Sequence, residues 1–276
     1  MRRRVALVLS AAALSACAAD YSGQYRDYAR ALETNGAFRT EAAPADAPFS
    51  SADLSRNFET IALNREYRRE GGELRQATTP SVVSRWADPI RYSLVGDGVT
   101  DADVAAYAAF AERLSFLTGL PFEAADENAN VNILILGSEE RRAFVDALRE
   151  NGAAERMPLL VDWSREVRYP CVGQVGFDEA NPGRIIGALI VVKAELEGVF
   201  RESCMHEELT QSLGLMNDDD GVRPSIFNDD QEFALLTEHD ELLLRVLYDP
   251  RLAPGMAAEE AAALATQIIA DLRPEG

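Results

Sequence analysis

The fold is decided by residues 204–218, which read Cys204-Met205-His206-Glu207-Glu208-Leu209-Thr210-Gln211-Ser212-Leu213-Gly214-Leu215-Met216-Asn217-Asp218. Side chains four positions apart share one face of a helix, so Glu207 and Gln211 are expected to converge, with Glu208 beside them. Gly214 then permits a sharp turn that returns the following residues to this face. The stretch therefore predicts a polar site built on a helix and the turn after it.

The spacing is that of the metal-binding helix of zincin peptidases, in which a general base follows the first ligand and a glycine turn leads to the third. In this frame Glu207 is the first ligand, Glu208 the general base and Gln211 the second ligand. Asn217 or Asp218 then supplies the third ligand.

The residue types of this stretch differ from that motif. Zinc prefers imidazole and thiolate ligands, whereas Glu, Gln and Asn offer oxygen. A frame that begins at His206 leaves Thr210 at the second ligand position. Oxygen donors suit calcium better, but the acidic run 218–220 lacks the spacing of a calcium loop. The pattern predicts no particular cofactor and leaves a divalent cation, zinc or calcium, as an open alternative.

Regular elements surround the site helix. Apolar runs predict strands and the 3.6-residue period predicts helices. The strands are expected at 90–95, 131–136 and 185–192, and the helices at 22–34, 53–62, 100–119, 138–151, 201–215, 238–247 and 257–272. Residues 158–182 are expected to be irregular, apart from a short strand. This order predicts an α+β domain in which the site helix lies beneath a small mixed sheet.

The first 16 residues have the parts of a secretory signal, with three arginines followed by the apolar run 5–14. That run is too short to cross a bilayer, which needs roughly 20 residues. The sequence Leu14-Ser15-Ala16-Cys17 matches a lipobox, which predicts cleavage before Cys17 and a membrane anchor of lipid on its thiol. An ordinary signal peptide with a chance cysteine is the alternative. Ala18 replaces the aspartate associated with inner-membrane retention, so we expect the periplasmic side of the outer membrane.

Composition divides the mature chain into a tether and one domain. Residues 35–51 are rich in Ala, Pro and small polar residues, so 17–52 is expected to be a lipidated, flexible tether and 53–276 the folded domain. The net charge of −19 becomes −22 when the three signal arginines are removed, which excludes nucleic acid as a partner. Cys171 and Cys204 are then expected to form a disulfide, and a pair of zinc thiolates is the alternative.

A wider set of motifs carries a family resemblance. It comprises Trp86, Asp88-Pro89-Ile90-Arg91, Asn130-Val131, Cys204 and the segments 207–218, 225–229, 247–251 and 254–256. With these motifs the chain resembles the family called domain of unknown function 2927, a bacterial family, over residues 55–256. The resemblance implies a zincin-like fold of the metzincin type and assigns no reaction.

Two functions fit these features. The first is an envelope lipoprotein whose degenerate zincin-like site has a binding or structural role without zinc hydrolysis, with an envelope protein or peptide as its partner. In this role Glu207, Glu208 and Gln211 would hydrogen-bond the backbone of a loop. The alternative is a metal-dependent peptidase in which Glu208 is the general base.

Overall fold

Alternating apolar side chains place the central sheet between two layers of helices. In β6 (Val131–Leu136) and β8 (Arg184–Lys193), Ile133 and Ile190 belong to one core cluster, whereas the adjacent Leu134 and Val191 pack in a second cluster. Successive residues of a strand face opposite sides of a sheet. Both faces of this sheet are therefore covered, as is usual for parallel strands.

The computed structural model describes residues 20–70, 73–228 and 230–274. Within these ranges the helices are α1 (Ser22–Thr34), α2 (Ser51–Ala62), α3 (Asp101–Thr118), α4 (Ser138–Glu150), α5 (Pro158–Arg165), α6 (Gly198–Gln211), α7 (Glu238–Leu247) and α8 (Ala258–Leu272). The strands other than β6 and β8 are β1 (Asn64–Glu70), β2 (Glu73–Pro80), β3 (Arg85–Trp86), β4 (Ile90–Val95), β5 (Phe122–Ala124) and β7 (Cys171–Phe177).

The sheet is mixed but mostly parallel. Strands β3, β8, β6, β4 and β5 follow one another in that order and pair in parallel. Strand β7 pairs antiparallel with β8 and, within the described ranges, with no other strand, so it forms an edge. Strands β1 and β2 form a separate antiparallel hairpin. The expected mixture of helices with a mixed sheet is confirmed, although the sheet is larger than the small one we expected.

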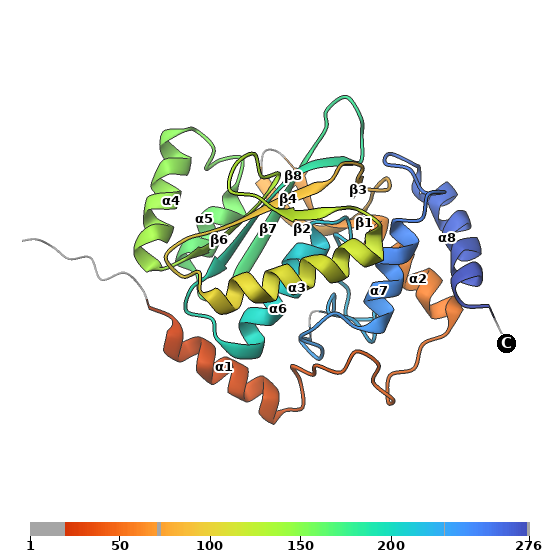
Figure 1. Cartoon of the computed structure of the whole chain (residues 1–276), viewed down its shortest axis with the longest axis horizontal. Coiled ribbons are helices and arrows are strands. Elements are labelled where there is room, and N and C mark those ends of the chain that lie inside the picture. Colours follow the sequence, from red (N-terminus) through yellow and green to blue (C-terminus); the bar gives the residue numbers. More distant parts are fainter. Residues whose placement is uncertain (1–19, 71–72, 229, 275–276) are drawn as a thin grey trace, which may run out of the picture.

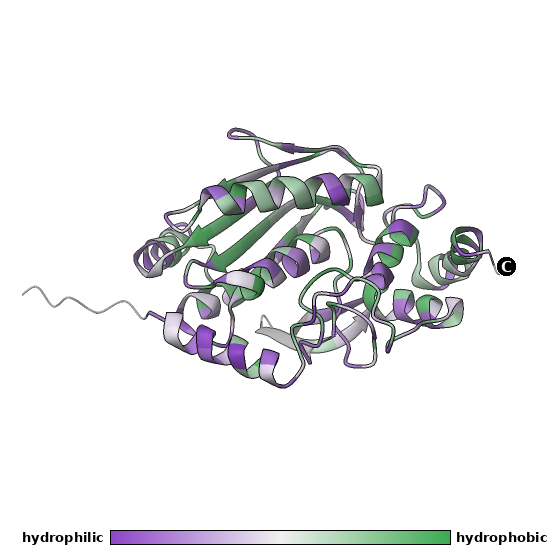
Figure 2. Ribbon diagram, turned by 60° about the horizontal axis from the view of Figure 1, so that its bottom comes forward, coloured by the Kyte–Doolittle hydropathy of each residue, from purple (hydrophilic) through white to green (hydrophobic). Residues whose placement is uncertain are grey.

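Helices cover the two faces of the sheet in pairs (Figure 1). Phe110 of α3 and Leu209 of α6 belong to the larger core cluster, whereas Phe144 of α4 and Trp163 of α5 pack in the smaller one. Helices α2, α7 and α8 pack together on the side of the molecule opposite α4. Figure 2 shows the strands as a mostly hydrophobic layer between more polar helices.

Local sequence signals set the ends of the helices. The Thr100 side chain accepts a hydrogen bond from the backbone of Asp103, whose carboxylate bonds back to Thr100, and Gly119 ends α3 in the left-handed conformation. The predicted helices 22–34, 138–151 and 238–247 and the strands 90–95 and 131–136 lie within one residue of the observed bounds.

The middle segment is more regular than we expected. Instead of an irregular stretch with one short strand, residues 158–182 contain α5 and the seven-residue strand β7. Gly173 and Gly176 interrupt the alternation of side chains in β7, so the pattern in the sequence is weak. Pairing with β8 supplies the order that the local sequence does not show.

The segment before residue 53 also differs from the flexible tether that we expected. Tyr21, Tyr25 and Phe38 are buried in the main core, and the rings of Tyr25 and Phe38 contact that of Phe200 on α6. The segment is rich in small residues, but these few aromatic rings decide its packing. An aromatic side chain buries 150–250 Å², and three of them fix this segment to the domain.

The described part of the chain contains no helix with the length and apolar character needed to cross a membrane. The expected signal peptide, residues 1–16, and the expected lipidation site, Cys17, lie outside the described residues.

Candidate functional site

The site helix α6 is buried on most of its surface. Cys204, Met205 and Leu209 pack in the core, whereas Glu207 and Gln211 are half-buried beside a cavity. The helix ends at Gln211, about two turns after Ser203, its first buried polar residue. Its sequence therefore places carboxyl and amide groups at the wall of this cavity.

Gly214 turns the chain immediately after α6, as the sequence predicts. Its φ of 119° is favourable for glycine, and a Cβ atom there would lie 1.9 Å from the Ser84 carbonyl oxygen. Two carbonyl oxygens of this turn accept hydrogen bonds from distant side chains. Trp86 Nε1 donates to the Ser212 carbonyl at 2.8 Å, and the Tyr248 hydroxyl donates to the Leu213 carbonyl at 2.9 Å. These bonds satisfy carbonyls that the helix leaves without partners.

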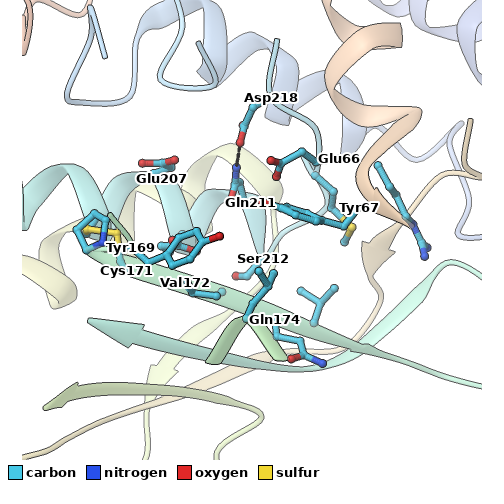
Figure 3. A pocket seen from close by; sticks show the side chains of 18 of the residues that line it. Glu66, Tyr67, Tyr169, Cys171, Val172, Gln174, Glu207, Gln211, Ser212 and Asp218 are labelled. Carbon is cyan, nitrogen blue, oxygen red and sulfur yellow. Dashed lines mark hydrogen bonds between the residues drawn. A yellow bond between two sulfur atoms is a disulfide. The ribbon is translucent and has the colours of Figure 1, made fainter. Parts of the chain in front are cut away.

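The turn returns Asp218, but not Asn217, to the site helix. Gln211 Nε2 donates hydrogen bonds to both carboxylate oxygens of Asp218, at 2.8 and 3.1 Å (Figure 3). Asn217 is fully buried, does not line the cavity and donates its amide to the Thr60 carbonyl of α2. The structure therefore brings together Glu207, Glu208, Gln211 and Asp218, and gives Asn217 a contact with another helix.

A cavity of about 910 Å³ lies over this cluster. Its walls are α6, β7, the hairpin of β1 and β2, the start of α5, and the loop that joins α5 to β7. Ligand pockets typically measure 300–1,000 Å³. The cavity is therefore large enough for a ligand of several residues.

Glu208 lies at the base of the cavity, where it contacts β7. Its carboxyl accepts a hydrogen bond from the backbone N–H of Gly173, and a Cβ atom on Gly173 would lie 2.6 Å from Glu208 Oε2. Burial, together with the nearby charges of Asp218 and Glu66, raises the pKa of Glu208 to about 8, and the hydrogen bond from the Gly173 N–H opposes this rise. Glu208 therefore carries a proton for most of the time at neutral pH.

A disulfide joins the two walls of the cavity. Cys171, the first residue of β7, is bonded to Cys204 of α6, with Cα atoms 5.9 Å apart. The predicted Cys171–Cys204 bridge is confirmed, and the alternative of two zinc thiolates is not. Both cysteines line the cavity, so the bond fixes the edge strand β7 to the site helix α6 at the cavity wall.

The two histidines of the chain lie away from the cavity. His206 is buried, its Nδ1 accepts the backbone N–H of Leu236 at 3.0 Å, and its ring stacks on Phe110. Burial lowers its pKa to about 3, so the ring is neutral. His239 is fully buried, and its Nε2 is 3.0 Å from the amide nitrogen of Asn57.

The residues at the site do not fit zinc. The amide nitrogen of Gln211 faces the carboxylate of Asp218, so these two groups satisfy each other instead of turning two oxygens toward one ion. Glu208 is largely protonated, and Asn217 lies outside the cavity. Among the described residues, no three His, Cys, Asp or Glu side chains form a group that could hold a metal ion.

The sequence did not identify several residues that line the cavity. Glu66 and Tyr67 reach it from β1, and Tyr169 and Gln174 from the loop before β7 and from β7 itself (Figure 3). A signal for the hairpin is present, because the polar segment 64–70 is followed by Gly71-Gly72, a turn sequence. Nothing in the local sequence places that hairpin beside α6.

The fold and site define a class: a mixed domain of helices and strands, in which a sheet edge and a polar helix enclose a ligand-sized cavity. The chain belongs to the family described as protein of unknown function (DUF2927), whose sequence model matches residues 51–267. No curated protein and no solved structure matches the chain. The matched range includes α2 and every residue of the cavity, so the site belongs to the family domain.

Proposed function

We propose that this chain is an exported envelope lipoprotein, anchored through Cys17 at the outer membrane, whose domain binds an extended polypeptide segment in the cavity. The scaffold is proposed to be zincin-like, which the spacing of Glu207, Glu208 and Gln211 on α6 supports. The observation that carries the binding role is the free edge of β7 beside the cavity.

The free edge offers backbone groups to a ligand. Along a strand of an antiparallel pair, one residue directs its N–H and C=O groups toward the partner strand, and the next residue directs them away from it. The N–H of Gly173 bonds to Glu208, so Gly173 faces away from β8, and the period of two places the backbone groups of Val175 on the same side. Extended peptides commonly bind a sheet edge of this kind as an added strand.

The cavity is lined by charges of both signs. Figure 3 shows Glu66, Glu207 and Asp218 on the same side of the cavity as Gln211, and the arginines Arg65, Arg156 and Arg168 also line the cavity. Because both signs are present, the lining does not require one charge of its ligand. We therefore propose an extended segment that binds through its backbone.

Glu208 supports binding rather than metal-dependent hydrolysis. A general base must be ionised and free to take a proton from water. Glu208 is buried, carries a pKa of about 8 and is hydrogen-bonded to Gly173. Its carboxyl instead hydrogen-bonds the backbone of the edge strand β7. This contact is similar to the one that the sequence suggested, in which Glu208 bonds the backbone of a loop.

Selection from a random peptide library displayed on phage tests the proposal. The target is the mature chain with Cys17→Ser, and selected peptides are measured against Val175→Pro and Val175→Ala. Both variants lose the valine side chain, but only proline removes the N–H at the free edge, and proline is tolerated at edge strands.

We expect the selected peptides to bind Val175→Pro at least tenfold more weakly than Val175→Ala, because one edge hydrogen bond and its geometry are lost, about 1.4 kcal/mol. Equal affinity for the two variants would show that the edge is not used. A library that yields no binder would contradict the proposal as a whole.

A further inference from the structure

We infer that the start of α1 and the loop of residues 165–168 lie against the membrane surface, so that the domain is held at the bilayer instead of being free on a long tether. The inference rests on the lipid anchor at Cys17 in the proposed function. It adds the orientation of the domain and the face that meets the lipid.

The distance from the anchor to the folded chain is short. Cys17 precedes Asp20, the first described residue, by three positions, and three extended residues span at most roughly 11 Å. The next residue, Tyr21, is already buried. A lipid on Cys17 would therefore keep Tyr21 close to the headgroups.

Helix α1 is fixed to the domain by specific contacts of its tyrosines. The Tyr21 hydroxyl donates to the Arg165 carbonyl at 2.6 Å, and the Tyr25 hydroxyl donates to the Val167 carbonyl at 2.8 Å. Lys193 Nζ lies 4.5 Å from the centre of the Tyr21 ring and 3.1 Å from the Tyr25 hydroxyl. These contacts join α1 to the end of α5 and to β8.

The face around these contacts is less acidic than the chain as a whole. Arg165 pairs with Asp162 at 3.1 Å, and Arg168 pairs with Glu166 at 2.5 Å. Val167 between them is 36% exposed. A surface of balanced ion pairs and one exposed valine meets phospholipid with less repulsion than the rest of a strongly acidic protein.

The same loop forms part of the cavity. Arg168, Tyr169 and Pro170 line it, and they directly follow Val167, whose carbonyl accepts the hydrogen bond from Tyr25. Figure 1 shows the start of α1 on the same side of the molecule as α4 and α5. One rim of the binding cavity is therefore placed next to the membrane.

Fluorescence quenching on vesicles tests this orientation. The lipidated full-length protein carries Val167→Cys, or Phe116→Cys as the control, and an environment-sensitive dye on the new thiol. Phe116 is 86% exposed near the end of α3. The vesicles contain phosphatidylethanolamine, phosphatidylglycerol and a lipid with a spin-labelled headgroup. Cys171 and Cys204 are bonded to each other, so the introduced thiol is free to react alone.

We expect the dye at position 167 to lose most of its fluorescence and the dye at position 116 to lose none. Equal quenching at both positions on protein that floats with the vesicles would overturn the orientation and leave the anchor intact. Protein that does not float at all would overturn the anchor itself, and with it the inference.

A second variant tests the part played by α1. Tyr21→Ala with Tyr25→Ala releases the helix from the domain while the lipid remains, so we expect unchanged flotation and loss of quenching at position 167. Full quenching in this variant would contradict the inference that α1 holds this face to the membrane.

Discussion

Replacement of Glu208 by glutamine is expected to change how the stability of the protein depends on pH. The folded protein holds the Glu208 proton up to a pKa of about 8, whereas the unfolded chain releases it near the ordinary value of 4.5. Between these two values the native state binds more protons than the unfolded state. The contribution of Glu208 to the free energy of unfolding is therefore complete below pH 4.5 and is lost as the pH rises through 8.

The size of this loss follows from the two pKa values. Each difference of one in pKa corresponds to about 1.4 kcal/mol, so Glu208 costs the folded protein at most roughly 5 kcal/mol at pH 9 relative to pH 4. Glutamine does not titrate and keeps an oxygen that accepts the Gly173 N–H. Glu208→Gln should therefore gain stability over the wild type as the pH rises from 5 to 9.

Urea unfolding of the mature chain at constant ionic strength, from pH 5 to pH 9, measures the effect. Glu207→Gln is the matched control, because Glu207 is the adjacent glutamate and is only half-buried. Lys193, whose pKa burial lowers to about 7, has the opposite effect, since its contribution rises with pH between 7 and 10.5. That contribution is common to all three proteins and cancels in the difference. A constant difference between wild type and Glu208→Gln across this range would refute the reasoning.

Two further predictions concern the bridge and the metal. Cys171→Ser with Cys204→Ser opens a loop of 33 residues, which should lower the free energy of unfolding by about 4 kcal/mol in urea titrations; a change below about 1 kcal/mol would contradict the role of the bridge. Elemental analysis of protein purified without a histidine tag should find zinc well below one equivalent, with no change in Gln211→Ala. A full equivalent that disappears in Gln211→Ala would instead restore the metallopeptidase alternative.

Much of the fold could be predicted because its signals are local. Thr100 and Gly119 mark the two ends of α3, and the apolar run 131–136 marks a buried strand. The hairpin of β1 and β2 and the strand β7 could not be predicted in the same way. The strands β1 and β2 are too polar to show an apolar alternation and pair with each other, whereas β7 is interrupted by glycine and is ordered by its pairing with β8.

The site was predicted in part. The spacing of Glu207, Glu208 and Gln211 follows from the period of one helix, and the return of Asp218 follows from the turn at Gly214. The position of Asn217 did not follow, because the Thr60 carbonyl that it binds lies 157 residues away in the sequence.

The sequence by itself determined the class of domain, the disulfide partners and the face of α6 on which the polar residues lie, because each depends on neighbours along the chain or on counting cysteines. Only the tertiary structure decided that Glu208 holds a proton, that β7 leaves an edge open beside it, and that α1 is fixed to the core. Desolvation and strand pairing depend on which distant segments pack together, and no local pattern records that.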